Sequence, residues 1–357
     1  MRANSLHGGF VLGSARCGST LLSDILRLHP AILSLSEVFS TAGPNAFPQG
    51  RIGAGRFWHG LARPTRFASA IANPDRAPRE FLYGRAGPAQ FDPWFCPPIL
   101  QIALPHLSDD PDALFHWLQS RALAAPRQDA GAHYRDLFSA LARQQGRRVW
   151  VERSGGSIIA TRTLLRLFPG ARHLLLTRNG PDTVLSMADY PATRIAVWMW
   201  KRLRPLGIDL MAPGSHYGRG RIWRALQASG RIFPVTRILD TRPDPADVGA
   251  FWSAMMQRGT QAMAAIPPGD LAHLSYESLV ADPRRQLRAV GRFLAGEAPD
   301  DWLDRAAALP QKRPSRLDDL SQPDRQRLRE SCAMGEAAIA AFLARRFGAK
   351  PDQRTEL

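Results

Sequence analysis

The chain has 357 residues, 45% of them hydrophobic, which is enough for a folded protein with a sizeable buried core. Its formal net charge is +16, and all of its 47 basic residues are arginines except Lys201, Lys312 and Lys350. Long blocks of like charge are absent, so we expect no nucleic-acid partner. Its three scattered cysteines exclude a disulfide framework and a cysteine-rich metal site.

The N-terminal region lacks the features of a secretory signal. Its apolar run, residues 9–12, is far shorter than a signal-peptide core. No stretch approaches the roughly 20 apolar residues of a membrane span. We therefore expect a cytoplasmic protein.

Short apolar runs alternate with helical patterns along the chain. We expect strands at residues 10–12, 149–151, 174–176 and 271–276, each followed by a helix, at 21–28, 158–167, 181–187 and 283–295. Further helical patterns lie at 111–125, 133–145 and 321–347. The alternation predicts an α/β fold with a central parallel sheet that helices cover on both faces.

Two long stretches separate these units, about 41–147 and 189–246, and both are rich in Pro, Gly, Trp and Arg. We interpret them as insertions into a single domain that spans residues 1–357. Residues 195–202 mix aromatic, aliphatic and basic side chains. This run predicts a core helix, with an apolar pocket or contact with a membrane surface as alternatives.

A glycine-rich loop, Gly13-Ser14-Ala15-Arg16-Cys17-Gly18-Ser19-Thr20, joins the first predicted strand to its helix. Unpaired N–H groups at a helix N-terminus form a site for phosphate or sulfate. The spacing nearly matches the loop of P-loop enzymes, but Ser19 stands where the phosphate-binding lysine is expected, and Arg16 carries the charge. The guanidinium group of an arginine can donate two hydrogen bonds to one oxyanion. A P-loop kinase or related phosphotransferase stays an alternative, which the missing lysine disfavours.

Residues 13–22 resemble the 5'-phosphosulfate loop of sulfotransferases, the enzymes that use 3'-phosphoadenosine 5'-phosphosulfate (PAPS). Cys17 replaces the usual serine, with a redox-sensitive thiol as the alternative reading. Arg178 and Ser186, eight positions apart, resemble the 3'-phosphate site of the family, and Tyr276 resembles its nucleotide-contacting tyrosine. The resemblance implies a P-loop-like sulfotransferase fold. The donor-binding residues that it implies are Arg16, Cys17, Gly18, Ser19, Thr20, Leu21, Arg178, Ser186 and Tyr276.

Two other segments match the family less well. Residues 149–157 resemble a family strand, but Arg153-Ser154-Gly155-Gly156-Ser157 replaces its usual Lys-Thr-Pro end, which changes how donor or acceptor is approached. We interpret the basic segment 312–315 as a solvated turn outside the site.

The resemblance also implies two catalytic residues, Arg16 and Glu37. Sulfuryl transfer needs an in-line nucleophile and stabilisation of spreading charge, which Arg16 is expected to provide at the bridging oxygen. Glu37, shortly after the first helix, is expected to take the proton of the acceptor hydroxyl. A supporting role for Glu37, with His29 as the base, is the alternative. We expect no metal.

The sequence therefore predicts a sulfotransferase that acts on a hydroxyl of a small-molecule, sugar or lipid acceptor. A basic nucleic-acid-binding protein is the alternative from another class; its affinity would fall steeply with salt. Neither the acceptor nor the oligomeric state can be read from the sequence.

Overall fold

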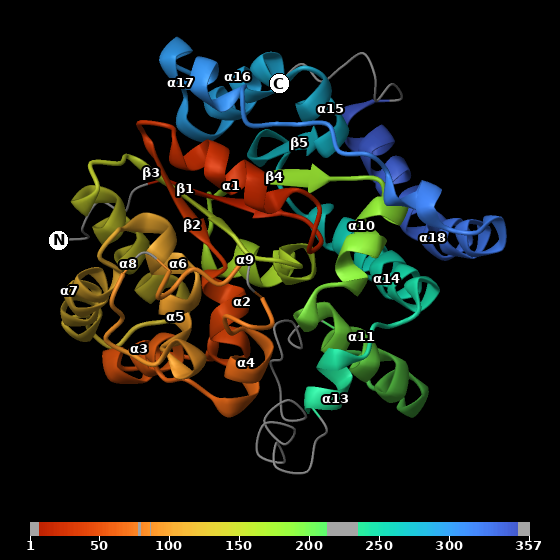
Figure 1. Ribbon diagram of the computed structural model, residues 1–357. Coiled ribbons are helices and arrows are strands. Elements are labelled where there is room, and N and C mark those ends of the chain that lie inside the picture. The colour runs from red at the N-terminus through yellow and green to blue at the C-terminus, as the bar shows by residue number, and fades with distance from the viewer. Residues whose placement is uncertain (1–6, 78–79, 86, 213–234, 349–357) are drawn as a thin grey trace.

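The structure is a computed structural model that describes residues 7–77, 80–85, 87–212 and 235–348. The described residues form an α/β fold around one five-stranded, all-parallel sheet, with helices on both faces (Figure 1). The strand order is β2-β3-β1-β4-β5. The strands are β1 (Gly8–Leu12), β2 (Ile32–Ser36), β3 (Val149–Arg153), β4 (Arg172–Thr177) and β5 (Leu271–Ser275).

The four strands that the sequence predicts are confirmed, and β2 is an additional edge strand. In a sheet with one solvated face, alternate polar residues of a strand face water. Here Ser34 and Ser36 are buried, and their hydroxyls lie 2.9 and 2.6 Å from the Ser23 hydroxyl of the helix above. The hydroxyls of both β2 serines are therefore satisfied inside the protein by Ser23 of α1.

The upper face of the sheet in Figure 1 is covered by four helices that share one hydrophobic core with it. They are α1 (Ser19–Arg27), α15 (Tyr276–Ala281), α16 (Pro283–Ala295) and α17 (Asp300–Ala306). Trp302 lies in this core, fully buried, and its indole N–H donates to the Ile25 carbonyl at 3.1 Å. The core thus fixes α1 and the loop that precedes it.

The other face carries the larger core and two groups of helices, seen at the lower left and at the right of Figure 1. The lower-left helices are α2 (Val38–Ala42), α3 (Ala54–Ala62), α4 (Arg66–Ile71), α5 (Pro98–Gln101), α6 (Ala103–Leu107), α7 (Pro111–Leu123) and α8 (Ala130–Gln144). The others are α9 (Thr161–Leu167), α10 (Gly180–Ala188), α11 (Pro191–Leu203), α13 (Val235–Asp240), α14 (Pro245–Met263) and α18 (Gln322–Phe347).

The structure confirms the helices predicted at 111–125, 133–145 and 321–347, which are α7, α8 and α18. The run 195–202 lies in α11, where Ile195, Val197 and Met199 are buried, as expected for a core helix. Helices of the 41–147 stretch share one core with β1. The single domain and its insertions stay predictions, and residues 213–234 of the second stretch lie outside the described residues.

Glycines let three of the right-hand helices approach closely. A Cβ on Gly335 of α18 would lie 2.6 Å from the Trp252 ring of α14, and a Cβ on Gly180 of α10 would lie 2.9 Å from the same ring. The backbone N–H of Gly180 also donates to Glu336 of α18 at 3.1 Å. These contacts fix the start of α10, which begins two residues after Arg178.

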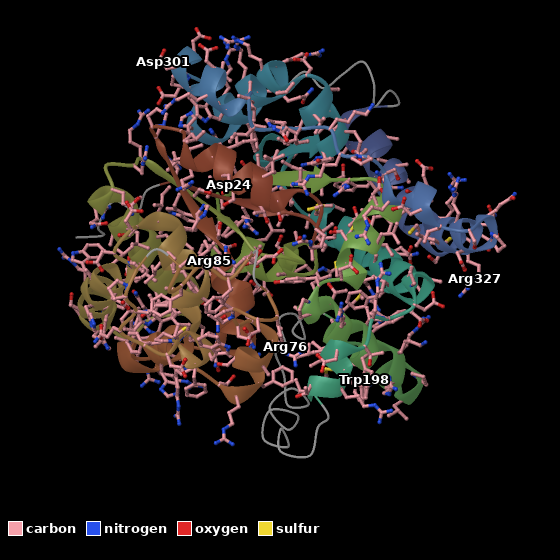
Figure 2. The ribbon with its side chains drawn as sticks, in the orientation of Figure 1. Asp24, Arg76, Arg85, Trp198, Asp301 and Arg327 are labelled. Atoms are coloured by element: carbon pink, nitrogen blue, oxygen red, sulfur yellow. The ribbon has the colours of Figure 1, made fainter. Side chains whose placement is uncertain are left out.

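Charged side chains cover the outside of the molecule, as Asp301 on α17 and Arg327 on α18 illustrate (Figure 2). Arg76, which follows α4, lies between the two helix groups in Figure 2 and pairs with Asp240 of α13 at 2.6 Å. Within the described ranges, no helix combines the length and the apolar character needed to cross a membrane.

Candidate active site

The carboxyl ends of all five strands meet at one edge of the sheet, the usual ligand position in an open parallel sheet. At this edge, each strand ends at, or is closely followed by, a charged or aromatic residue that could contact a ligand. In the order of the sheet these residues are Glu37 after β2, Arg153 at the end of β3, Arg16 after β1, Arg178 after β4 and Tyr276 after β5.

The glycine loop leaves the central strand β1 and leads into α1. Its start is fixed by Ser157, whose hydroxyl accepts from the Gly13 N–H at 3.3 Å and donates to the Val11 carbonyl at 2.9 Å. Gly18, the residue before α1, has a φ of 99° and provides no side-chain cap. Ser19, Thr20 and Leu21 form the first turn, so their backbone N–H groups lack intrahelical partners. This is the geometry of a helix N-terminal anion site.

Cys17 is a packing residue of this loop. Its thiol is buried and donates to the Ser14 carbonyl at 3.0 Å, and a Cβ on Gly13 would lie 2.8 Å from its sulfur. Burial raises the pKa of the thiol to about 11. The structure therefore contradicts the alternative of a redox-sensitive thiol, because a reactive cysteine needs a low pKa and access.

Arg16 extends from the loop towards α10. Its Nε donates to the Ser186 hydroxyl at 3.1 Å, so two residues predicted from separate motifs contact each other. Its guanidinium lies 5.5 Å from the centre of the Tyr190 ring and forms an ion pair with Glu80. The sequence predicted neither Tyr190 nor Glu80 as part of the site.

Arg178 and Tyr276 form the other end of the site. The Arg178 guanidinium carbon lies 4.7 Å from the centre of the Tyr276 ring. The buried Arg178 Nε has no hydrogen-bond partner among the described residues. A buried N–H without a partner is costly, so an acceptor atom of a ligand at this point would be stabilising.

Tyr276 also packs against the glycine loop, because a Cβ on Gly18 would lie 2.7 Å from its ring. The sequence predicted that Tyr276 would end the fourth strand. In the structure β5 ends at Ser275, and Tyr276 begins α15. The reason is Ser275, whose hydroxyl caps the helix by accepting from the Ser278 N–H at 3.0 Å.

The basic segment 312–315, predicted to lie outside the site, passes over this end. The Gln311 carbonyl accepts from the Tyr276 hydroxyl at 3.4 Å, and the Ser315 hydroxyl donates to Asp182 of α10 at 2.7 Å. The side chains of Lys312 and Arg313 between these anchors are exposed.

Glu37 lies on the opposite side of the loop, held by the segment that departs from the family pattern. Its carboxylate forms an ion pair with Arg153, accepts from the Gly155 N–H at 2.9 Å and accepts from the Ser40 hydroxyl. A Cβ on Gly155 would lie 3.7 Å from Glu37 Oε2 and 3.6 Å from Ala15 Cβ. The carboxylate therefore lies beside the loop.

A second carboxylate, Glu152, is buried behind Glu37. One oxygen accepts from the Ser154 hydroxyl at 2.6 Å, and the other has no partner among the described residues. Burial, reinforced by the nearby charge of Glu37, raises the pKa of Glu152 to about 8. The sequence did not indicate that Glu152 would be a buried carboxylate beside the site, because a single glutamate inside a strand forms no recognisable pattern.

Tyr190, the residue before α11, lies against Arg16 and within electrostatic range of both ion pairs. Its pKa is raised, first by burial and then by the charges of Glu37 and Glu80, while Arg16 and Arg153 lower it. All four charged side chains therefore act on one tyrosine hydroxyl.

His29, the alternative base, is a structural residue. It is fully buried near the C-terminal end of α1, the opposite end from the glycine loop. Its Nδ1 accepts from the Ala31 N–H at 3.1 Å, and its ring packs edge-to-face on Trp302. Burial lowers its pKa. The structure contradicts a catalytic role.

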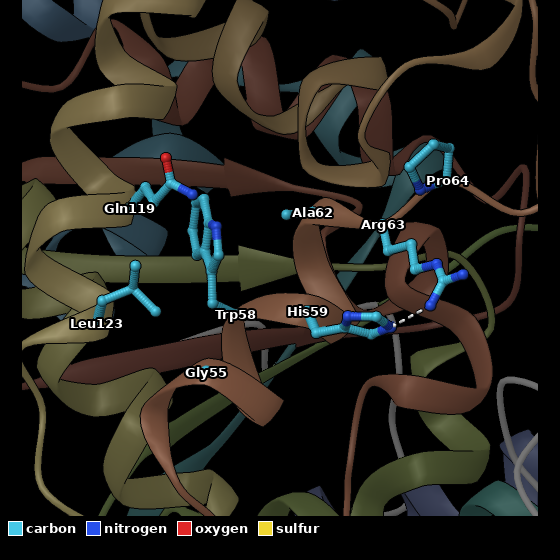
Figure 3. Close-up of a pocket in the computed structure, with 8 residues that line it drawn as sticks. All are labelled: Gly55, Trp58, His59, Ala62, Arg63, Pro64, Gln119 and Leu123. Atoms are coloured by element: carbon cyan, nitrogen blue, oxygen red, sulfur yellow. Dashed lines mark hydrogen bonds between the residues drawn. The ribbon is translucent and has the colours of Figure 1, made fainter.

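Among the residues that the structure describes, no group of three or more His, Cys, Asp or Glu could hold a metal ion. An open pocket of about 590 Å³ lies between α3 and α7, where Trp58, His59 and Gln119 line it (Figure 3). None of the predicted site residues lines this pocket.

Solved structures that resemble this chain include several sulfotransferases. The sulfotransferase domain of a Synechococcus olefin synthase is 17% identical with a TM-score of 0.43, over 93% of this chain and 97% of that one. A Mycobacterium avium sulfotransferase is 15% identical with a TM-score of 0.42, over 92% and 76%. One from Alicyclobacillus acidocaldarius is 14% identical with a TM-score of 0.40, over 96% of each. Likenesses this distant establish neither donor nor acceptor.

Comparison with protein-family models and with curated proteins gave no match.

Proposed function

We propose that this protein is a sulfotransferase that moves a sulfuryl group from PAPS to a hydroxyl of a small-molecule, sugar or lipid acceptor. The observation that carries the proposal is the placement of two arginines at the carboxyl edge of the sheet. Arg16 reaches Ser186 from the glycine loop, and Arg178 lies against Tyr276 with a buried, unpartnered N–H. A ligand with two anionic groups matches this pair.

The residues present fit such a donor. The first turn of α1 offers backbone N–H groups without intrahelical partners for the 5'-phosphosulfate end, beside Arg16. Arg178 and Ser186 would hold the 3'-phosphate, and the Tyr276 ring offers an aromatic surface to the nucleoside.

The chemistry needs little covalent help from the protein. The donor supplies the sulfuryl group, whose bond to the phosphate oxygen breaks as the acceptor oxygen bonds to sulfur. Arg16 stabilises the charge that develops on the leaving oxygen. Glu37 takes the acceptor proton; its bond from the rotatable Ser40 hydroxyl is the one that an acceptor hydroxyl can replace. No step in this scheme requires a metal.

A phosphotransferase is the competing proposal, and nucleotide binding without magnesium separates the two. We expect adenosine 3',5'-bisphosphate to bind at least about tenfold more tightly than ATP, because only the bisphosphate carries a 3'-phosphate for Arg178. Calorimetric titration measures both affinities.

The Arg178→Ala variant should lose most of this preference. The control variant is Arg284→Ala, which removes a surface arginine of α16 that pairs with Asp300 and Asp304 of α17. It should keep the preference for the bisphosphate. Tighter binding of ATP than of the bisphosphate by the unmodified protein would overturn the proposal.

A further inference from the structure

We propose that Glu80 is an internal counter-ion of the donor site: it occupies Arg16 while the donor is absent, and the anionic group of the donor must displace it. This inference rests on the proposed function for the identity of the donor. The observation behind it is the ion pair between the Arg16 guanidinium and the Glu80 carboxylate, 64 positions apart in the chain. The side chains are 28% and 21% exposed, so a ligand can reach both.

The backbone holds Glu80 in this place. The Glu80 N–H donates to the Ala77 carbonyl at 3.1 Å, and the N–H of the buried Phe81 donates to the same carbonyl at 2.9 Å. The Leu82 N–H donates to the Gln101 carbonyl at 2.9 Å. Residues 80–82 are thus hydrogen-bonded to Ala77 and to Gln101 of α5, and from this position the Glu80 carboxylate reaches Arg16.

Arg16 does not need Glu80 to keep its position. Its Nε is already held by Ser186, and its guanidinium lies over the Tyr190 ring. The pair adds little net stability, because the cost of removing both charges from water offsets much of their attraction. The role of the carboxylate is therefore better sought in ligand binding than in folding.

A second anion at Arg16 would meet the Glu80 charge at close range. Like charges a few ångströms apart in a partly buried site repel each other far more strongly than in water. An arriving phosphate or sulfate group must therefore displace the Glu80 carboxylate, and this requirement lowers the affinity of every anion that uses Arg16.

The Arg178 end of the site differs in this respect. Its Nε is unpartnered within the described chain, and its guanidinium lies over Tyr276. A ligand held at Arg178 keeps its second anionic group next to Arg16, where the high local concentration favours displacement of Glu80. A free anion has no such advantage. We infer that Glu80 selects ligands with two anionic groups over single anions.

The substitution Glu80→Gln keeps the shape of the side chain and removes its charge. We expect the variant to bind adenosine 3',5'-bisphosphate about tenfold more tightly than the unmodified protein, by calorimetric titration at fixed ionic strength. Stabilisation by inorganic sulfate, measured as a thermal shift, should also increase. Adenosine 3'-monophosphate, which lacks the 5' group that would pair with Arg16, should gain much less.

Two control variants accompany these measurements. Glu80→Asp keeps the charge and should not gain affinity for the bisphosphate. Glu297→Gln removes a surface glutamate that pairs with Arg148 and should leave all three ligands unchanged. Urea unfolding of each variant verifies that it is folded.

Unchanged or weaker bisphosphate binding in Glu80→Gln would overturn the inference, since it would mean that Glu80 only supports Arg16. An equal gain for adenosine 3'-monophosphate would also overturn it. If the unmodified protein prefers ATP, the proposed function fails, and the sulfate measurement then decides on Glu80 alone. A larger sulfate shift in the variant supports the counter-ion, and an equal shift refutes it.

Discussion

At the scale of single residues, Glu37 and Arg178 have opposite surroundings. The Glu37 carboxylate is held by Arg153, Gly155 and Ser40, so its position is fixed before any ligand arrives. Arg178 has a buried donor without a partner. A fixed carboxylate suits proton transfer, and an unsatisfied donor suits ligand binding.

We therefore expect Glu37→Gln to lower kcat by about 10²- to 10⁴-fold, the usual contribution of a general base, with little change in the affinity for adenosine 3',5'-bisphosphate. Arg178→Ala should weaken that affinity by about 10- to 100-fold, the usual loss for a hydrogen bond to a charged group. Sulfate transfer from labelled donor and calorimetry measure the two effects. Full turnover in Glu37→Gln would remove the base role.

Sequence reasoning predicted the site residues that follow a recognisable strand. Arg16, Ser186 and Arg178 were found because a glycine loop or an apolar run marks their place, but the contact between Arg16 and Ser186 was not predicted, since the sequence paired Ser186 with Arg178. Glu80 and Tyr190 were missed. They reach Arg16 through long connections whose path in space no local pattern specifies.

At the scale of elements, the glycine loop and α15 pack so closely that only glycine fits between them. Gly18 has a left-handed φ of 99°, and the Tyr276 ring occupies the place of its missing Cβ. Gly296, which ends α16, also has a positive φ, 80°, but nothing lies within 4 Å of its Cβ position. A comparison of alanine substitutions at these two glycines therefore separates the cost of backbone strain from the cost of steric overlap.

Gly296→Ala should lower the free energy of unfolding by about 1 kcal/mol, through backbone strain alone. Gly18→Ala should cost about 2–3 kcal/mol, because the overlap with Tyr276 adds to that strain. It should also weaken bisphosphate binding by displacing the loop. Urea unfolding of both variants provides the comparison; equal losses would show that Tyr276 yields without cost.

Elements with strong local signals were predicted well. Asp282 caps α16 and Gly296 ends it, as the sequence indicated. The strand β2 was missed because its alternating serines look like a solvent-exposed pattern. The segment is a strand because its backbone pairs with β3, and its buried serines are satisfied by Ser23 of α1; both are tertiary contacts.

At the scale of the whole molecule, buried ionisable groups set how stability depends on pH. Burial lowers the pKa of His106 to about 3 and those of His173 and His273 to about 4. Between these values and about 6.5, the unfolded chain binds more protons, so stability rises with pH. Glu152 acts in the opposite direction. Its pKa of about 8 means that the folded protein binds more protons between about 4.5 and 8, so its contribution to stability falls as pH rises.

We expect these opposing effects to give a maximum of stability near neutral pH. Glu152→Gln should unfold at a higher urea concentration than the unmodified protein at pH 8.5, because the amide needs no proton. The difference should shrink towards pH 5, with a slope that approaches about 1.4 kcal/mol per pH unit for one proton. Urea midpoints from pH 4 to 9 test this. A difference that is constant over this range would mean that Glu152 does not titrate between the two states.

The strand order also decides when during synthesis the site can form. The strand β3 lies between β1 and β2 in the sheet, yet it follows both in the chain by more than a hundred residues. The Glu37 N–H donates to the Arg153 carbonyl at 2.7 Å, and the Gly13 N–H donates to Ser157. At a synthesis rate of about 5–20 residues per second, these partners emerge on the order of 10 s after the glycine loop. The glycine loop of the nascent chain therefore lacks these native contacts until β3 and the residues after it have been translated.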